Sequence, residues 1–347
     1  MQSDTVPLIN KKRGKKKLTR LKKSILGFLA CTMLWGIPTA GYAAEDVQVW
    51  GKEKVKYDNN VIEGKTQTKI KYTTTLGLKQ KVDDHWSWKA GGQNESTYDY
   101  SKDSTKFLTR WAETSLTYKN KGTSVIFGRD SYTPGYGMIV SGEMTGLQVS
   151  QNIGDKLNMK YYRGYDKYKG SMVTFGGEKY LMSSDTSGKE EQRINIQAFD
   201  ATYKFDKKWE AKAARYGAEL DQTGQEATYW EVGAKYKANK DWSILVEQGR
   251  SDANAYNMAN AIMFLYRGID PSKVGSYGIR VGHYRVEKFA MLDTDYTKGT
   301  GHSVWGTRIG FVPAKNTSIN LDYFVGKCPE DSSKKLHGYA VTANFAF

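Results

Sequence analysis

Few residues in this chain have the chemistry of catalysis or metal binding. The chain has four histidines and two cysteines, which are His85, His283, His302, His337, Cys31 and Cys328. None of them stands at a spacing typical of metal ligands, and the HExxH, CxxC, P-loop and G-x-S-x-G motifs are absent. The sequence therefore predicts no metal, no cofactor and no enzymatic centre.

One pair leaves an enzymatic alternative open. A phospholipase of the outer membrane would need a histidine and a nucleophilic serine on one outward face of a barrel, near its rim. His283 shares strand parity with Val281, which is expected to face lipid, and Ser303 is a nearby serine with outward parity. We treat this alternative as the weaker one, because a surface histidine without a catalytic role is far more common.

The charged residues are numerous and unevenly placed. The 347 residues include 52 Lys and Arg against 37 Asp and Glu, a net charge of +15. Residues 1–43 account for +8 of this charge, which leaves +7 for residues 44–347. A nucleic-acid binder would gather its cations on one face with aromatic side chains between them. The cations of residues 44–347 are spread through almost the whole sequence, so we expect no nucleic-acid partner.

The first 43 residues have the three parts of a secretory signal peptide. Residues 11–23 are strongly basic, residues 24–35 are apolar, and Gly41-Tyr42-Ala43 offers small residues before a cut after Ala43. An uncleaved membrane anchor is the alternative, which the glycine and proline after the apolar run disfavour. We expect an exported chain of residues 44–347 that forms one domain.

Residues 44–347 alternate between apolar and polar side chains in segments of about 10–14 residues, the pattern of β-strands with two different faces. In the last segment Tyr339, Val341, Ala343, Phe345 and Phe347 share one face. A soluble β-sandwich would show the same alternation, but its strands are usually about 5–6 residues long. Longer strands, connected alternately by short turns and long loops, are typical of transmembrane barrels.

Sixteen such segments can be counted, from residues 46–58 to residues 335–347. The sequence therefore predicts an all-β fold, a transmembrane antiparallel β-barrel of about 16 strands (about 14–18) with a water-filled lumen. Tryptophan recurs directly after short turns, at Trp86, Trp209 and Trp242. This recurrence indicates an aromatic girdle at one membrane interface.

Four stretches carry a likeness to a known family. They are Val47-Gln48-Val49-Trp50-Gly51-Lys52, Thr75-Leu76-Gly77-Leu78-Lys79, the block from Arg110 to Arg129, and the last strand with its terminal Phe347. In these stretches the chain resembles the general diffusion porins of bacterial outer membranes. The resemblance implies an outer-membrane homotrimer, a Phe347 signal for the outer-membrane assembly machinery, and a loop folded into the lumen between strands 5 and 6.

The resemblance also implies the residues of a pore constriction. Lys52 and Arg110 fall on positions of wall cations, and Thr75 stands where a second arginine is usual. The inward loop spans about 130–143 and begins and ends with acids, Asp130 and Glu143, and Arg129 precedes it. No arginine stands near the position where the family usually has a third.

Strand parity assigns further side chains to the lumen. The expected cations are Lys52, Lys54, Lys56, Lys69, Lys71, Lys79, Lys89, Arg110, Lys160, Lys212, Lys235, Arg280 and Arg308, and the expected anions are Glu210, Glu231, Glu247 and Asp322. A basic lumen concentrates anions, so we expect a weak preference for them. Among these cations Lys52, Arg110, Arg280 and Arg308 stand in the middle of their strands.

Glu113 does not fit the alternation of its segment. It shares a face with Trp111 and would point toward lipid, which is costly for a carboxylate. Two explanations remain open. Either another subunit covers Glu113, which suits a trimer, or a β-bulge shifts the register between the two residues.

The sequence as a whole favours passive diffusion of small hydrophilic solutes across an outer membrane. The expected partners are outer-membrane lipids, small hydrophilic or anionic solutes and further copies of the chain. Two other functions stay open: a substrate-specific outer-membrane channel, and a surface adhesin or polymer-binding barrel. A mature chain that is fully soluble without detergent would contradict the barrel.

Overall fold

The computed structural model describes residues 47–168, 171–175, 178–182, 192–221, 224–292, 301–329, 331 and 333–347. The signal peptide predicted at residues 1–43 lies outside these ranges. Where the chain is described, it has no helix that is both long and apolar enough to cross a membrane.

The described chain is built of strands. They are β1 (Val47–Ile62), β2 (Lys65–Lys81), β3 (Trp86–Asp99), β4 (Ser104–Trp111), β5 (Thr114–Asn120), β6 (Thr123–Tyr132), β7 (Gly142–Ile153), β8 (Leu157–Tyr168), β9 (Ser171–Phe175), β10 (Glu178–Met182), β11 (Gln192–Lys204), β12 (Trp209–Leu220), β13 (Gln225–Lys237), β14 (Trp242–Ser251), β15 (Met258–Arg267), β16 (Tyr277–Val286), β17 (His302–Ala314), β18 (Thr317–Lys327) and β19 (Lys335–Ala346).

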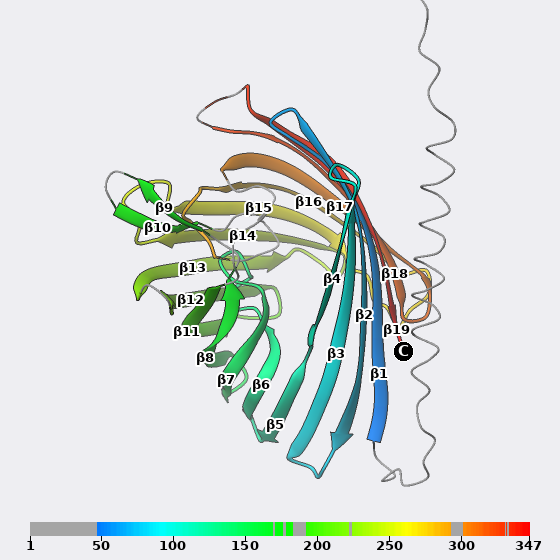
Figure 1. Ribbon diagram of the computed structural model, residues 1–347. Helices are drawn as coiled ribbons and strands as arrows, with labels where there is room; N and C mark the ends of the chain where they lie inside the picture. Colours follow the sequence, from blue (N-terminus) through cyan, green and yellow to red (C-terminus); the bar gives the residue numbers. More distant parts are fainter. Residues whose placement is uncertain are drawn as a thin grey trace, which may run out of the picture. The chain divides into compact units, whose positions relative to one another are not determined.

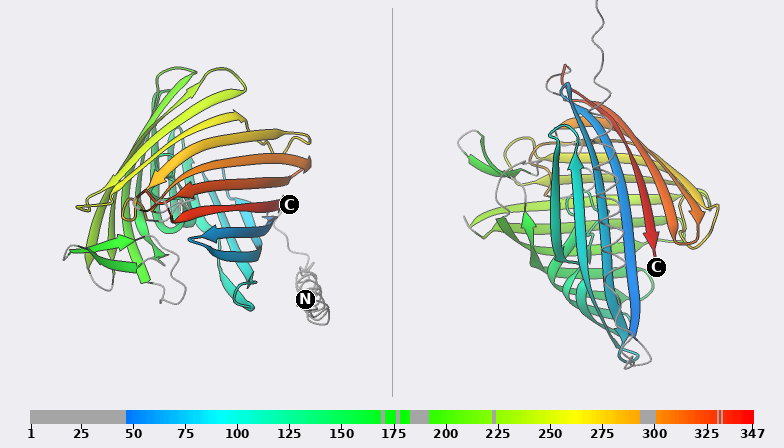
Figure 2. Two further views of the ribbon diagram at one scale, coloured as in Figure 1. Left: turned by 90° about the horizontal axis from the view of Figure 1, so that it is seen from above. Right: turned by 45° about the vertical axis from the view of Figure 1, so that its right-hand side comes forward.

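Antiparallel pairing of neighbouring strands closes these strands into a barrel (Figure 1). The first and last strands pair along their length, from Lys52 opposite Ala346 to Ile62 opposite Leu336. Figure 2 shows this closure, with blue β1 beside red β19. β8 pairs with β11, and β9 and β10 form a separate hairpin. Since β4 and β5 both pair with β3, they are two halves of one barrel strand, and the predicted 16 strands are confirmed.

A β-bulge separates β4 from β5. Gly92 pairs with Trp111 and Lys89 pairs with Ser115, so two residues of β3 stand opposite three of the partner strand. One extra residue reverses which side chains face outward. Trp111 is 73% exposed and Leu116 is 42% exposed, so the outward face moves from odd to even positions. Glu113 therefore turns into the lumen, and the bulge explanation is confirmed.

Three short turns share one local arrangement. In each, one side-chain oxygen accepts two backbone N–H groups: Asp83 from His85 and Trp86, Asp206 from Lys208 and Trp209, and Asn239 from Asp241 and Trp242, at 2.6–2.9 Å. Such Asx turns fix the backbone at the start of the next strand. Each tryptophan packs on a tyrosine of a neighbouring strand, with ring centroids 4.5–4.9 Å apart. This geometry places the three outward indoles at the short-turn end of the barrel, as the predicted girdle requires.

Candidate functional site: the barrel lumen

The loop between β6 and β7 packs against the inner wall. These are the fifth and sixth strands of the barrel, because β4 and β5 count as one. The Gly135 N–H donates to Asp200 Oδ2 of β11 at 2.5 Å, and the Tyr136 N–H donates to Glu231 Oε1 of β13 at 2.6 Å. The Ile139 N–H donates to the other oxygen of Glu231 at 3.2 Å. Two wall carboxylates thus hold three loop amides.

Apolar packing supports these hydrogen bonds. Met138, Ile139 and Val140 at the loop tip are buried in a cluster with small and aromatic side chains of the inner wall, Tyr216 among them. Gly135 has φ of +58°, and a Cβ there would lie 2.3 Å from Glu231 Oε1. The position therefore excludes any side chain, because the carboxylate approaches the loop backbone too closely. The largest buried apolar cluster of the described chain lies at this contact.

The acids of this half of the wall serve the loop. Glu231 is 1% exposed and also accepts a hydrogen bond from the Tyr216 hydroxyl at 3.1 Å, and Glu247 is buried as well. Glu210 accepts from the Tyr136 hydroxyl at 3.2 Å, while Lys212 donates to the Gly135 carbonyl at 3.1 Å. Of the four predicted lumen anions, Glu231 and Glu247 are thus shielded from solutes, and Glu210 is engaged with the loop.

The opposite part of the wall carries a cluster of paired charges. Lys52 Nζ lies 2.9 Å from Glu113, and Lys89 Nζ lies 2.9 Å from Glu113 and 2.8 Å from Asp130. Asp130 also accepts a hydrogen bond from the Ser115 hydroxyl at 3.2 Å. The bulge before β5 makes this cluster, because it brings Glu113 to the inner face.

Further lysines of the same wall are also paired. Lys56 lies 3.2 Å from Asp58, Lys71 lies 2.7 Å from Glu95, and Lys69 lies 3.8 Å from Asp99. Together with Glu113 and Asp200, these acids add five inward carboxylates to those predicted. The expected excess of lumen cations was therefore too large. β1 continues to Ile62, past the segment expected at 46–58, and its extra residues lengthen the paired wall.

The register brings three predicted site residues into one row. Lys52 pairs with Thr75, Thr75 with Gln93, and Gln93 with Arg110. The Gln93 amide donates to the Thr75 hydroxyl at 3.4 Å and accepts from Arg110 Nε at 2.5 Å. Gln93, which the sequence did not single out, is the residue that links the predicted wall positions.

The remaining predicted constriction residues, Arg129, Asp130 and Glu143, all take part in ion pairs. Arg129 lies 3.4 Å from Glu143 and 3.4 Å from Asp166, so Glu143 pairs with its neighbour. Asp130 pairs with Lys89 on the wall, as described above. The acids at the two ends of the loop are thus both engaged in ion pairs with nearby cations.

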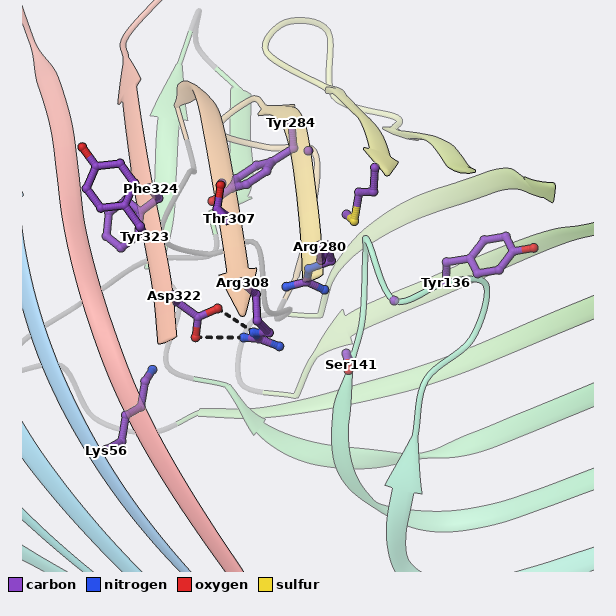
Figure 3. A pocket seen from close by; sticks show the side chains of 14 residues that line it. Lys56, Tyr136, Ser141, Arg280, Tyr284, Thr307, Arg308, Asp322, Tyr323 and Phe324 are labelled. Carbon is purple, nitrogen blue, oxygen red and sulfur yellow. Dashed lines mark hydrogen bonds and ion pairs between the residues drawn. The ribbon is translucent and has the colours of Figure 1, made fainter. Parts of the chain in front are cut away.

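A hollow in the lumen lies between the loop and strands β15 to β18, with Lys56 of β1 at its edge (Figure 3). Arg280 and Arg308, both predicted to line the pore, lie on its wall. Arg308 donates to Asp322 through Nε at 2.5 Å and through a terminal nitrogen at 3.2 Å. On the side of the loop, Tyr136 and Ser141 line the hollow.

His283 and Ser303 lie in contact, as their parity suggested. The His283 Nε2 and the Ser303 Oγ are 2.7 Å apart, and the imidazole packs on Trp305 with ring centroids 5.2 Å apart. A nucleophilic pair also needs a third group that orients the base. In the described ranges no carboxylate is hydrogen-bonded to His283, and no group of residues suited to hold a metal ion is found. We therefore assign the pair to the packing of the outer face.

No protein-family model and no curated protein matches the chain. Solved structures do match. OprB of Pseudomonas putida, solved at high pH, has 12% identity and a TM-score of 0.60, covering 90% of this chain and 97% of that one. OmpF of Salmonella typhi, in complex with daunomycin, has 12% identity and a TM-score of 0.55, covering 87% and 97%. OpdQ of Pseudomonas aeruginosa has 10% identity and a TM-score of 0.52, covering 88% and 99%.

At such identities the likeness concerns the fold alone. It extends over 87–90% of this chain and 97–99% of the three other chains. The porin-like barrel expected from the sequence is thereby confirmed.

Proposed function

We propose that the protein is an outer-membrane channel through which small hydrophilic solutes diffuse. The closed 16-strand barrel with a charged inner face and a loop packed inside it carries this proposal. A barrel of this size encloses a water-filled passage, and the loop narrows it. The test is conductance of the purified mature chain in planar bilayers: stable steps in KCl support the proposal, and a protein that inserts without conducting contradicts it.

The proposed ion preference is weakly anionic. The additional inward acids offset much of the positive charge expected from the sequence, and most of the lysines of β1 to β3 that face the lumen are paired. The reversal potential in a KCl gradient tests the sign. A potential that indicates cation preference would contradict this part while leaving the channel itself intact. A substrate-specific channel remains the second candidate, favoured by the hollow beside Arg280.

We further propose a homotrimer, on grounds other than those first expected. Glu113 faces the lumen, so it gives no support to a subunit contact. The outward face of β1 to β4 does. Glu53 pairs with Thr74, Thr74 with Asn94, and Asn94 with Thr109, which makes one outward row of polar residues across four strands.

This polar row contrasts with the outer face of β14 to β19. There the outward side chains are large and apolar, for example Phe264, Ile309 and Val341. A carboxylate on a lipid face is costly, and Glu53 stands at the seventh position of a 16-residue strand. A second copy of the chain that covers this row would remove the cost.

Export and assembly complete the proposal. Residues 1–43 are proposed to direct secretion and to be removed. The terminal Phe347 is proposed to be read by the outer-membrane assembly machinery. Its backbone pairs with Gly51 through two hydrogen bonds of 2.8 and 3.1 Å, and a Cβ at Gly51 would lie 2.3 Å from the Phe347 ring. The glycine thus lets the terminal ring lie on β1, where the barrel closes.

A further inference from the structure

The inner wall contains two arginines that stand directly opposite each other. Arg280 of β16 pairs with Arg308 of β17 in the register, and both side chains face the lumen. Like charges in directly opposed positions destabilise a sheet. Asp322, opposite Arg308 on β18, neutralises one of the two with its two-point contact. In the described chain Arg280 has no ion-pair or hydrogen-bond partner.

A gap in the wall lies beside this pair. The next inward row toward the β16–β17 loop has Gly282 opposite Gly306, with Met263 and Phe324 on either side. Both glycines line the hollow, which lies next to the guanidinium groups in Figure 3. A Cβ at Gly306 would lie 3.5 Å from the Tyr284 ring, in ordinary van der Waals contact, whereas a Cβ at Gly282 would lie 2.9 Å from the Met263 side chain. The roomier side of the hollow is therefore at Gly306.

The charges around the hollow do not cancel. Its lining includes Arg280, Arg308 and Lys56; Arg308 pairs with Asp322 and Lys56 with Asp58, which leaves the charge of Arg280 without an ion pair in the described chain. The Asp322 contact holds the Arg308 guanidinium in a fixed orientation. Guanidinium groups bind planar and tetrahedral oxyanions through two parallel N–H donors, a geometry that chloride does not use.

From this arrangement we propose that the Gly282–Gly306 hollow is a binding site for a carboxylate- or phosphate-bearing solute on its passage through the lumen. Arg280 supplies the main contact, Arg308 supplies the second, and the side of the hollow at Gly306 provides the room for the anionic group. The bound oxyanion relieves the repulsion between the opposed arginines. The proposal rests on the proposed channel function and adds a recognition step to it.

Single-channel recordings with acetate and with inorganic phosphate added to KCl test the site. We expect the mature chain to show a saturable reduction of KCl conductance, and the stronger of the two blockers identifies the preferred oxyanion. Arg280→Gln is expected to raise the half-blocking concentration about tenfold, as the loss of a charge-assisted contact predicts. Gly306→Leu is expected to abolish the block by filling the hollow, with the reversal potential in KCl unchanged.

Lys235→Gln is the matched control, because it removes an inward cation of β13 that does not line the hollow. It is expected to leave the block as it is. An equal loss of block in Lys235→Gln and Arg280→Gln would overturn the site in favour of general lumen charge. Normal KCl steps with no block by either oxyanion would also overturn it, while the channel function would stand. An absence of steps in KCl would instead refute the proposed channel.

Discussion

Glu231 accepts a hydrogen bond from the backbone N–H of Tyr136 at 2.6 Å, although 95 residues separate the two along the chain. The same carboxylate accepts from the Ile139 N–H and from the Tyr216 hydroxyl. A loop backbone placed inside a barrel needs partners for its amides, because few waters reach a packed contact. The buried carboxylate of Glu231 provides such partners for two loop amides, those of Tyr136 and Ile139.

Replacement of Glu231 should therefore loosen the loop. In Glu231→Gln one acceptor oxygen becomes an NH2 group that faces the N–H of Tyr136 or Ile139, which leaves a buried amide without a partner. We expect a loss of about 1–3 kcal/mol in stability. The loosened loop should produce more frequent brief closures in single-channel traces, and barrel unfolding on heated gels should shift to lower temperature. Glu226→Gln, at an exposed end of the same strand, is the control; equal effects in both variants would contradict the role of Glu231.

The cluster around Glu113 sets the charge of the facing wall. Glu113→Gln should remove one negative charge from the lumen and release Lys52 from its ion pair, while Lys89 keeps its contact with Asp130. We expect the reversal potential in a KCl gradient to move toward anion preference. The change in stability should stay below about 1 kcal/mol, because Lys52 is largely solvated. Glu219→Gln, an exposed acid on the outer face, should leave the potential unchanged. A shift toward cations in Glu113→Gln would contradict the inward placement of this residue.

The bulge also shows where sequence reasoning succeeded and where it could not. Period-2 alternation predicts the strands because one face of a barrel wall meets lipid and the other meets water. The strand number and the inward orientation of Arg280 and Arg308 both follow from this alternation. A single extra residue at Ala112 reverses that parity, and its signal in the sequence is the misplaced Glu113, which a subunit contact explained equally well. The pairing of Lys89 with Glu113 and Asp130 depends on this reversal, so the sequence alone overestimates the free positive charge.

Strand parity also does not predict which inward side chains contact the loop. Glu231 and Glu247 have inward parity, as predicted, but whether an inward acid meets water or a folded loop depends on tertiary packing. The available signal in the sequence was Gly135, because a glycine in the loop allows another group to approach the loop backbone closely. Here that group is the carboxylate of Glu231. Gln93 offered no signal, because an uncharged amide in a strand is ordinary until its neighbours in the register are known.

The polar row on β1 to β4 leads to a prediction about assembly. Asn94 is exposed on the outer face between Thr74 and Thr109, so a larger side chain fits a monomer but not a subunit contact. Asn94→Trp should convert the trimer to monomers in detergent, measured as mass by light scattering. Val232→Trp, on the apolar outer face of β13, should remain trimeric, because lipid accommodates an extra indole. A wild-type chain that is already monomeric in mild detergent would contradict the proposed interface.

The turn before Trp209 should be sensitive to acid, whereas the similar turn before Trp242 should not. The backbone N–H groups of Trp209 and Lys208 hold the pKa of Asp206 below its usual range. A carboxyl with a lowered folded pKa stabilises its turn fully above the unfolded pKa of about 3.9, and this contribution is lost as pH falls through the folded value. Asn239 makes the same hydrogen bonds with an amide oxygen that does not titrate in this range.

Hydrogen exchange of single amides measures this difference within one molecule. The protection factor of the Trp209 amide should fall as pH drops below about 4, while that of the Trp242 amide should stay constant. In Asp206→Asn the acid-dependent loss should disappear, because the new amide oxygen accepts the same two hydrogen bonds at every pH. Parallel loss of protection at both tryptophans would instead mean that acid opens the whole short-turn end of the barrel. Protonation of Asp206 would then not be the cause of the loss at Trp209.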